Sequence, residues 1–296
     1  MFEGSTTAMV TPFKGGELDE TAFRQLVRHQ LNCGTNGILV AGCTGEAAAL
    51  SWEELKSLII WAGEEIRHHS KSTFLLAGTG TNNTRETVEK TAAARALGVD
   101  GVLLITPYYN KPSQEGLYQH YREVAQNTDV PIILYNVPGR TSVRLMPETV
   151  ARLGDLENIV AIKEAGGNLD DVSALLNKTN QVTVLSGDDT LTLPMMAIGG
   201  RGVISTTSNI DPERMARMCE YWFAGKVEEA RQMHNELFQL CKAMFVETNP
   251  MPAKAALSIM GMIENELRLP LVSVKQESIP VIEKALLGAG LLERRS

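Results

Sequence analysis

The sequence predicts an α/β fold: a closed parallel (β/α)8 TIM barrel followed by a C-terminal helical extension. Eight short apolar runs recur along the first two thirds of the chain, and segments with a helical period of apolar residues separate them. After about residue 225 the apolar runs stop and only helical patterns remain. An open, doubly wound sheet is the alternative. Such a sheet normally carries a glycine-rich nucleotide loop after its first strand, and the sequence TPFKGGELD does not have that pattern.

The predicted strands consist of small and β-branched apolar residues, which is typical of strands buried on both faces. They cover residues 6–12, 37–42, 73–78, 101–107, 131–138, 158–165, 182–189 and 202–209. Between the first two strands, Phe23, Leu26 and Leu31 share one face of a predicted helix. Asp19 can cap the start of this helix and Gly34 can end it.

Two domains are expected from this pattern. Residues 1–225 form the barrel, which is the catalytic domain, and residues 226–296 form the helical C-terminal domain. The second domain contains three or so amphipathic helices, interrupted by ETNPMP and RLPL.

Composition excludes several classes of function. The net charge of −7 argues against nucleic acid or an anionic membrane as a partner. No apolar run approaches the roughly 20 residues that span a bilayer, and the start MFEGSTTAMVTPF lacks the pattern of a signal peptide. Four scattered cysteines suit free thiols in a reducing cytoplasm, where we expect the protein to reside. The five histidines form no metal signature, so no metal site is expected.

A lysine stands at the end of the sixth predicted strand. In NIVAIKEAGGN, residues 158–168, Lys163 follows four apolar residues, and the glycines and Asn168 after it indicate a tight turn into a helix. A buried ammonium is unfavourable unless it is paired or loses its proton. The simpler interpretation is a salt bridge to Glu164, although adjacent strand residues point to opposite faces. The chemical interpretation is an amine that forms a Schiff base.

The ends of the other predicted strands carry residues suited to the same chemistry. In a (β/α)8 barrel, functional residues lie at the carboxyl ends of the strands. Polar and aromatic residues gather there: Cys43, Thr44, Tyr108, Tyr109 and Tyr135. Aromatic residues make up only 5% of the chain, yet three of its six tyrosines lie at these ends. Because tyrosines can donate the protons that carbinolamine chemistry needs, the pattern favours a catalytic Lys163.

A lysine that forms an imine with a 2-keto acid needs three kinds of help. Backbone N–H groups in the turn at Cys43–Gly45, leading into a helix, could bind a carboxylate, although a plain N-capping turn is the simpler interpretation. Tyr135 could shuttle protons, or it could be a barrel-mouth tyrosine hydrogen-bonded to backbone. Arg140, in NVPGRTS, could pair with a second carboxylate, or it could be a surface arginine.

Five motifs, in this order and spacing, resemble those of the dihydrodipicolinate synthase (4-hydroxy-tetrahydrodipicolinate synthase) family: GCTGE, TPYYNKP, YNVPGRT, IVAIKEA and SGDD. The resemblance covers essentially the whole chain. It implies a lyase of lysine and diaminopimelate biosynthesis that condenses pyruvate with L-aspartate 4-semialdehyde and needs no cofactor. A pyruvate-dependent aldolase or lyase acting on another aldehyde or a sugar acid is the alternative enzyme. A keto-acid sensor that has lost turnover is the alternative of another class, and intact Lys163 and Tyr135 argue against it.

The resemblance also implies roles for individual residues. Lys163 would form the Schiff base with pyruvate. Tyr135 would relay protons together with Tyr109, which would enter a neighbouring subunit's site. Cys43 stands where most members have a threonine that bridges the two tyrosines; a thiol is the weaker hydrogen-bonding group, so we expect a working but slower relay. Substrate binding is implied for Thr44, Arg140, Gly187 and Ile204, with Arg140 on the carboxylate of the semialdehyde.

Assembly and regulation follow from the same resemblance. The family is usually a homotetramer built from two tight dimers, and many members are inhibited by lysine at a site between tight-dimer subunits. The residues implied for that site are Trp52, Asn82, Glu86 and Tyr108. Leu55 stands where a histidine is common, and its side chain can neither donate nor accept a hydrogen bond. We therefore expect weak or absent inhibition by lysine.

Overall fold

The computed structural model describes residues 2–69 and 72–293, and within them eight parallel strands have the topology of a closed barrel. Their order is β1-β10-β9-β8-β7-β6-β5-β4. The closed order confirms the predicted fold class and shows that the open-sheet alternative is wrong. The strands are β1 (Gly4–Ala8), β4 (Gly37–Val40), β5 (Phe74–Gly78), β6 (Gly101–Ile105), β7 (Ile132–Asn136), β8 (Ile159–Glu164), β9 (Thr183–Ser186) and β10 (Gly202–Ser205).

Most of the strands are shorter than predicted. The predicted strand 6–12 ends at Ala8, and the predicted strand 202–209 ends at Ser205 and continues as the 3-10 helix η3 (Thr207–Asn209). The residues of η3 are all buried. They are Thr, Ser and Asn, whose side chains hydrogen-bond to nearby backbone groups and favour a turn over a strand.

A short hairpin near the start of the chain was not predicted. Strands β2 (Phe13–Lys14) and β3 (Glu17–Leu18) pair antiparallel, and Gly15 and Gly16 between them have φ angles of +61° and +88°. Glycine adopts these left-handed conformations without a steric penalty, so the pair Gly15 and Gly16 supplies the turn.

The chain divides into two compact units. The first consists of Phe74–Ile204 with the N-terminal residues up to Glu3, and the second consists of Gly4–Thr73 with the residues from Ser205 onward. The predicted domain boundary near residue 225 stays a prediction.

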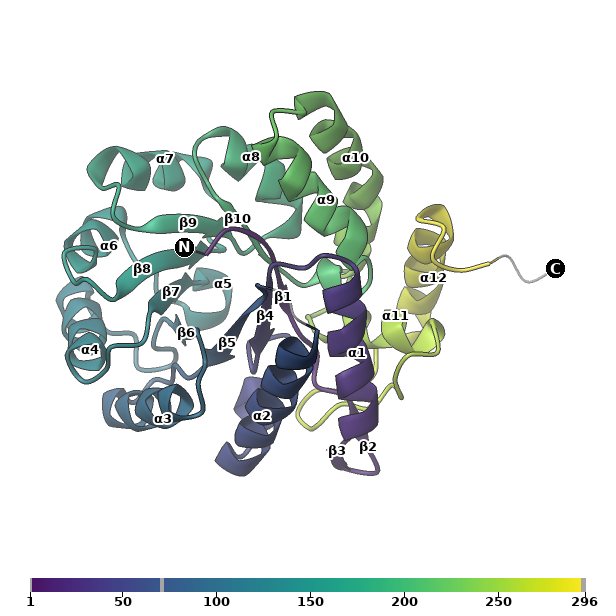
Figure 1. Cartoon of the computed structure of the whole chain (residues 1–296), viewed down its shortest axis with the longest axis horizontal. Coiled ribbons are helices and arrows are strands. Elements are labelled where there is room, and N and C mark those ends of the chain that lie inside the picture. The colour runs from purple at the N-terminus through teal and green to yellow at the C-terminus, as the bar shows by residue number, and fades with distance from the viewer. Residues whose placement is uncertain (1, 70–71, 294–296) are drawn as a thin grey trace. The chain divides into compact units, whose positions relative to one another are not determined.

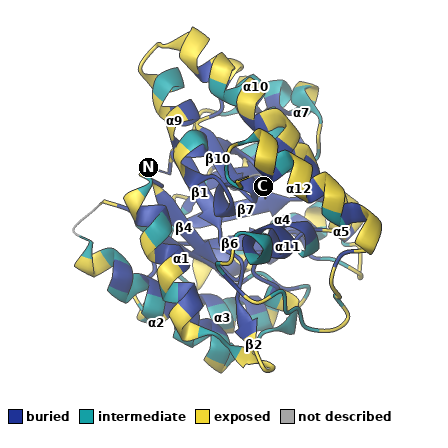
Figure 2. Ribbon diagram, turned by 90° about the vertical axis from the view of Figure 1, so that its right-hand side faces the viewer, coloured by how far each residue is buried: buried dark blue, intermediate teal, exposed yellow. Residues whose placement is uncertain are grey.

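In the first unit, helices cover the outer face of the strands. Figure 1 shows α3, α4, α6 and α7 outside strands β6 to β9, and these helices pack against one another in chain order. All five residues of β7 are buried, and the strands in Figure 2 are correspondingly dark blue. The helices of this unit are α3 (Thr84–Ala96), α4 (Gln114–Gln126), α5 (Pro138–Thr141), α6 (Pro147–Leu153), α7 (Leu169–Lys178) and α8 (Thr192–Ala197).

The second unit contains β1, β4, the β2–β3 hairpin and the remaining helices. In α1, Asp19 accepts a hydrogen bond from the N–H of Ala22, and Phe23, Leu26 and Leu31 are buried, as the sequence predicts. Helix α10 packs against α9 and α12, and α11 packs against α12. The α-helices are α1 (Glu20–Asn32), α2 (Trp52–His68), α9 (Pro212–Phe223), α10 (Val227–Ala243), α11 (Met251–Ile259) and α12 (Ile279–Gly288).

Candidate active site

Lys163 and Tyr135 lie opposite each other on neighbouring strands of the first unit. Tyr135 of β7 and Lys163 of β8 are register partners, and the Nζ atom of Lys163 lies 4.5 Å from the centroid of the Tyr135 ring. Each residue is only 5% exposed. The sequence placed the two residues one strand apart at the same end of the sheet, and the structure confirms this geometry. An amine and a phenol are thus held together away from bulk water.

Backbone hydrogen bonds fix the strand ends that carry this pair. The N–H and the hydroxyl of Thr106 donate to the carbonyl oxygen of Tyr135 at 2.9 and 2.8 Å. The N–H of Gly187 donates to the carbonyl oxygen of Glu164 at 2.7 Å. Gly187 also leaves room for the lysine, because a Cβ at this position would lie 3.1 Å from both Cγ and Cε of Lys163.

Glu164 lies on the opposite face of β8, toward α6 and α7. Its carboxylate accepts hydrogen bonds from Nδ2 of Asn136 at 2.9 Å and from the N–H of Gly166 at 2.6 Å. Burial raises the pKa of Glu164, and these two hydrogen bonds together with the charge of Arg144 oppose the increase. The side chain therefore joins β8 to β7 behind Lys163.

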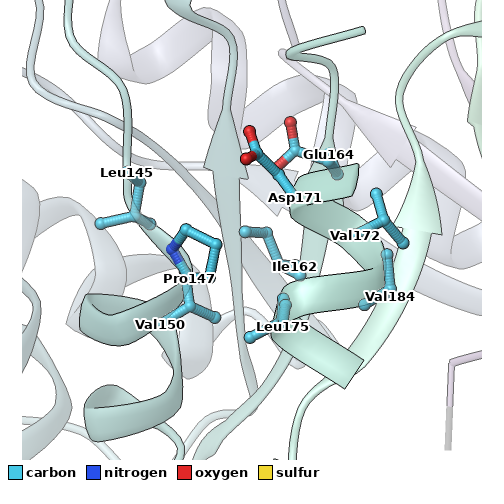
Figure 3. A pocket seen from close by; sticks show the side chains of 9 residues that line it. All are labelled: Leu145, Pro147, Val150, Ile162, Glu164, Asp171, Val172, Leu175 and Val184. Carbon is cyan, nitrogen blue, oxygen red and sulfur yellow. The ribbon is translucent and has the colours of Figure 1, made fainter. Parts of the chain in front are cut away.

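Glu164 also lines a small cavity between β8 and the two helices. Figure 3 shows its carboxylate near that of Asp171 at one end, with apolar side chains such as Ile162 and Leu175 along the rest. Asp171 pairs with Arg144. The cavity has room for about one water molecule, so it is too small for a substrate.

Tyr109 projects from a strained turn after β6. The N–H of Asn110 donates to the carbonyl oxygen of Tyr108 at 2.9 Å, and Tyr109 between them has a φ angle of +72°. This is a γ-turn of the rare, strained hand. Nδ2 of Asn110 donates to the carbonyl oxygen of Asn82 at 2.8 Å and anchors the turn. The Tyr109 side chain is 90% exposed, whereas Tyr108 is half-buried.

Arg140 and Ile204 are the other two predicted substrate-binding residues of the first unit. Arg140 belongs to α5, directly after β7, and it is exposed. The short helix begins with Pro138, whose fixed φ angle suits the first turn. Ile204 lies in β10 and is 1% exposed.

In the second unit, Cys43 and Thr44 follow β4 in a tight turn. The N–H groups of Gly45 and Ala47 both donate to the carbonyl oxygen of Gly42, at 3.0 and 3.3 Å. The turn was expected to lead into a helix, but it leads only into the three-residue 3-10 helix η1 (Ala47–Ala49). Helix α2 begins later, at Trp52, because Ser51 supplies its capping box with Glu54. The expected helix is therefore a single 3-10 turn whose N-cap is Glu46, and no side chain caps it.

The side chain of Thr44 is buried and hydrogen-bonded. Its Oγ1 atom accepts a hydrogen bond from Nδ2 of Asn249 at 2.9 Å and lies 3.1 Å from Oγ1 of Thr206. Thr44 is 2% exposed, and Cys43 beside it is half-buried. Asn249, in the segment ETNPMP that interrupts the C-terminal helices, was not predicted as a partner of Thr44.

The residues suggested for a lysine effector fall in both units. In the first unit, Asn82 is joined to Asn110, and Glu86 in the first turn of α3 pairs with Lys90 at 2.7 Å. In the second unit, Trp52 is half-buried at the start of α2. Leu55 is only 5% exposed and belongs to the buried face of α2.

Sequence reasoning also missed a buried ion pair below the Thr44 turn, between Glu46 and Lys254. The available signal was the single charged residue in the helix sequence MPAKAALSI, comparable to Lys163 at the end of its apolar strand. Among residues 2–69 and 72–293 there is no group of three side chains that could hold a metal ion, and no helix there is long and apolar enough to cross a membrane.

These features define a class of protein: a (β/α)8 barrel that holds a buried lysine beside a tyrosine on neighbouring strands. The model of the dihydrodipicolinate synthetase family matches residues 1–288. The 4-hydroxy-tetrahydrodipicolinate synthase of Thermodesulfovibrio yellowstonii is 48% identical over 294 residues, which cover 99% of this chain and 100% of the relative.

Two similar solved structures have ligands. The dihydrodipicolinate synthase of Acinetobacter baumannii, in complex with pyruvate, has a TM-score of 0.95 and 42% identity and covers 99% of this chain and 100% of its own. The synthase of Cyanidioschyzon merolae, with lysine bound, has a TM-score of 0.94 and 39% identity and covers 98% and 99%.

The chain belongs to the dihydrodipicolinate synthetase family. Its reaction is the condensation of pyruvate with L-aspartate 4-semialdehyde and cyclisation to 4-hydroxy-tetrahydrodipicolinate, a step of lysine and diaminopimelate biosynthesis. The predicted function and enzyme class are thereby confirmed, and the alternative aldolase or lyase is not favoured.

Proposed function

We propose that Lys163 is the amine that forms the Schiff base with pyruvate and that Tyr135 moves the protons of this step. The observation that carries the proposal is the buried contact of the Lys163 Nζ atom with the Tyr135 ring, at 4.5 Å. A buried amine beside a proton donor is the arrangement that imine formation needs.

The reaction then proceeds through a carbinolamine, an imine and an enamine. The Lys163 amine attacks the keto carbon of pyruvate, and the carbinolamine loses water to give the imine. Loss of a proton from the methyl carbon gives an enamine, which attacks the aldehyde carbon of the semialdehyde. The amino group of the new chain displaces the lysine and closes the ring. Since the protonated imine itself accepts electrons, the steps require no cofactor.

Other residues bind the two carboxylates. Thr44 and the backbone around it bind the carboxylate of pyruvate, and Arg140 binds that of the semialdehyde. Gly187 leaves room for the aliphatic stem of Lys163, and the buried Ile204 contributes an apolar contact. Cys43 takes the place of a threonine between the tyrosines of the proton relay.

Tyr109 completes the relay of a neighbouring subunit in a homotetramer of two tight dimers. A tyrosine that is 90% exposed, at the centre of a strained γ-turn, supports this role. Backbone strain of this kind persists at functional sites where the surrounding structure maintains it. The cytoplasm is the proposed location, because free cysteines suit a reducing compartment.

Borohydride trapping tests the central proposal. Reduction in the presence of pyruvate should add one pyruvate-derived mass to the peptide that contains Lys163, and Lys163→Ala should lose the adduct. A coupled assay with pyruvate and aspartate semialdehyde then compares Arg140→Ala with the wild type. The variant should weaken use of the semialdehyde far more than pyruvate binding, by about 2 kcal/mol or more. An adduct on another lysine would contradict the mechanism, and equal effects on both substrates would make Arg140 structural.

A further inference from the structure

A fully buried ion pair lies in the second unit, below the turn that carries Thr44. Nζ of Lys254, in α11, is 2.6 Å from Oε1 of Glu46, and the two side chains are 0% and 1% exposed. Glu46 follows Thr44 and Gly45 directly and has a φ angle of +53°. A non-glycine residue rarely adopts this left-handed conformation, so the surrounding contacts must maintain it.

The ion pair belongs to a closed ring of contacts around the turn. Nζ of Lys254 also donates to the carbonyl oxygen of Thr11 at 2.8 Å, and Oγ1 of Thr11 donates to the carbonyl oxygen of Gly45 at 2.7 Å. The ring therefore runs from Gly45 through Glu46, Lys254 and Thr11 and back to Gly45. The second oxygen of Glu46 accepts from the N–H of Arg268 at 3.0 Å.

The surroundings leave the turn little freedom. The ring of Phe13, which is 0% exposed, lies 4.4 Å from Nζ of Lys254 and 4.3 Å from the guanidinium carbon of Arg268. A Cβ at Gly45 would lie 3.0 Å from the carbonyl oxygen of Met9, so the backbone approaches closely there. Two cations held over one aromatic ring add favourable electrostatic contacts.

A buried ion pair is a poor means of stabilising a fold. Two well-packed apolar residues of similar volume often give equal or greater stability, because removing charges from water is unfavourable. Burial lowers the pKa of Lys254, and the charge and hydrogen bond of Glu46 oppose the decrease. The directional hydrogen bonds of the pair, which apolar residues cannot reproduce, point to a role in geometry instead.

We propose that Glu46 and Lys254 are positioning residues that hold the Thr44–Gly45 backbone in the orientation that binds the carboxylate of pyruvate. The inference rests on the proposed role of Thr44 and extends it to the C-terminal helices. Helix α11 thereby takes part in recognition of the keto acid through a residue that touches no substrate.

Two variants test the proposal. The double variant Glu46→Leu/Lys254→Met removes both charges together and leaves no unpaired ion. Thr11→Val removes only the hydrogen bond to Gly45 and keeps the ion pair. The matched control is Lys14→Met, which breaks the exposed pair of Lys14 with Glu264 at 2.8 Å in the same unit. For each protein, the pyruvate concentration that gives half-maximal borohydride trapping on Lys163 is measured together with the thermal midpoint.

We expect the double variant to need about tenfold more pyruvate and Thr11→Val several-fold more, with the control within about twofold of the wild type. The KM for the semialdehyde should change little in all three. Trapping at wild-type concentrations in both test variants, whatever their thermal midpoints, would overturn the positioning role and leave a structural one. If the double variant does not fold, the pyruvate concentration needed by Thr11→Val decides whether the ring of contacts positions the turn. A wild-type chain that gives no adduct would instead overturn the proposed function.

Discussion

At the scale of single residues, close packing restricts the positions that the Lys163 side chain can take. Tyr135 covers one side of the amine at 4.5 Å, and Gly187 faces the aliphatic stem. Interiors are packed so densely that one added methyl group forces neighbours to move. The identity of Gly187 therefore matters for chemistry, although glycine has no functional group.

Gly187→Ala should slow formation of the pyruvate adduct by about tenfold or more. The added Cβ would lie 3.1 Å from Cγ and Cε of Lys163 and 2.8 Å from Cβ of Ala165, so the amine must shift. The rate of borohydride trapping checks this. Gly288→Ala is the control, because a Cβ there meets nothing within 4 Å and alanine favours the helix α12. Trapping at the same rate in both variants would show that the lysine has more room than its contacts indicate.

Cys43→Thr should raise kcat a few-fold, within about 1 kcal/mol of barrier, with little change in KM for pyruvate. A hydroxyl is a better hydrogen-bond donor and acceptor than a thiol and should restore the proton relay. Steady-state kinetics of the coupled assay measure the change. Cys33→Thr, at the end of α1, is a control that should leave kcat unaltered. A decrease in kcat for Cys43→Thr would mean that the thiol is adapted to the relay of this protein.

At the scale of elements, the contact of Glu164 with Asn136 joins β8 to β7 on the face away from Lys163. Oδ1 of Asn136 accepts from the N–H of Leu145 at 3.0 Å, so the loop before α6 is held by the same amide. The two strands that carry the amine and the phenol are thus joined by side chains as well as by their ladder. The spacing between Lys163 and Tyr135 depends on these side-chain contacts and on the backbone ladder together.

The pH dependence of stability should reveal Glu164. Burial raises its pKa in the folded protein above the usual value of 4.5, so the folded state binds the proton more tightly than the unfolded state. The contribution of Glu164 to stability is therefore fully present below the unfolded pKa and is lost as pH rises through the folded pKa. As pH rises from about 4.5, the stability of the wild type should therefore fall relative to that of Glu164→Gln.

Urea unfolding at several pH values measures this difference. Glu148→Gln is a control of opposite sign, because hydrogen bonds from its own N–H and from Lys178 lower the pKa of Glu148. The wild type should gain stability relative to that control as pH rises from the lowered folded pKa to the unfolded value of 4.5, and the difference should change little above it. A difference between the wild type and Glu164→Gln that does not change with pH would show that Glu164 has an ordinary pKa.

At the scale of the whole molecule, Glu86 of the candidate effector site already has a partner within its own unit, and position 55 holds an apolar side chain. Leu55 packs in the buried face of α2, and Glu86 pairs with Lys90 on α3. A lysine effector would have to compete with Lys90 for that carboxylate, and Leu55 offers it no hydrogen bond.

Lysine should therefore inhibit weakly or not at all, with any half-inhibition above about 1 mM. A titration of lysine in the coupled assay measures this, and Glu86→Ala should behave as the wild type does if no effector binds. Strong inhibition at lower concentrations, abolished in Glu86→Ala, would contradict this prediction and show that Glu86 supports binding without a polar group at position 55.

The sequence by itself determined the barrel and the candidate catalytic lysine. Strands buried on both faces and helices with one apolar face leave periodic patterns, and α1 has the cap and the buried residues that its pattern predicted. The carboxyl ends of parallel strands meet at one edge of the sheet, so Tyr135 and Lys163 could be placed together before any coordinates.

Only the tertiary structure decided the polar contacts that surround these residues. Lys254 meets Glu46 across 208 positions of sequence, and Asn249 meets Thr44 across 205. The γ-turn at Tyr109 and the close fit of Gly187 were likewise absent from the pattern. Periodicity records which residues of one element are buried. It carries no information about which group of a distant element will form a hydrogen bond with a buried polar side chain, because that pairing depends on how the elements pack.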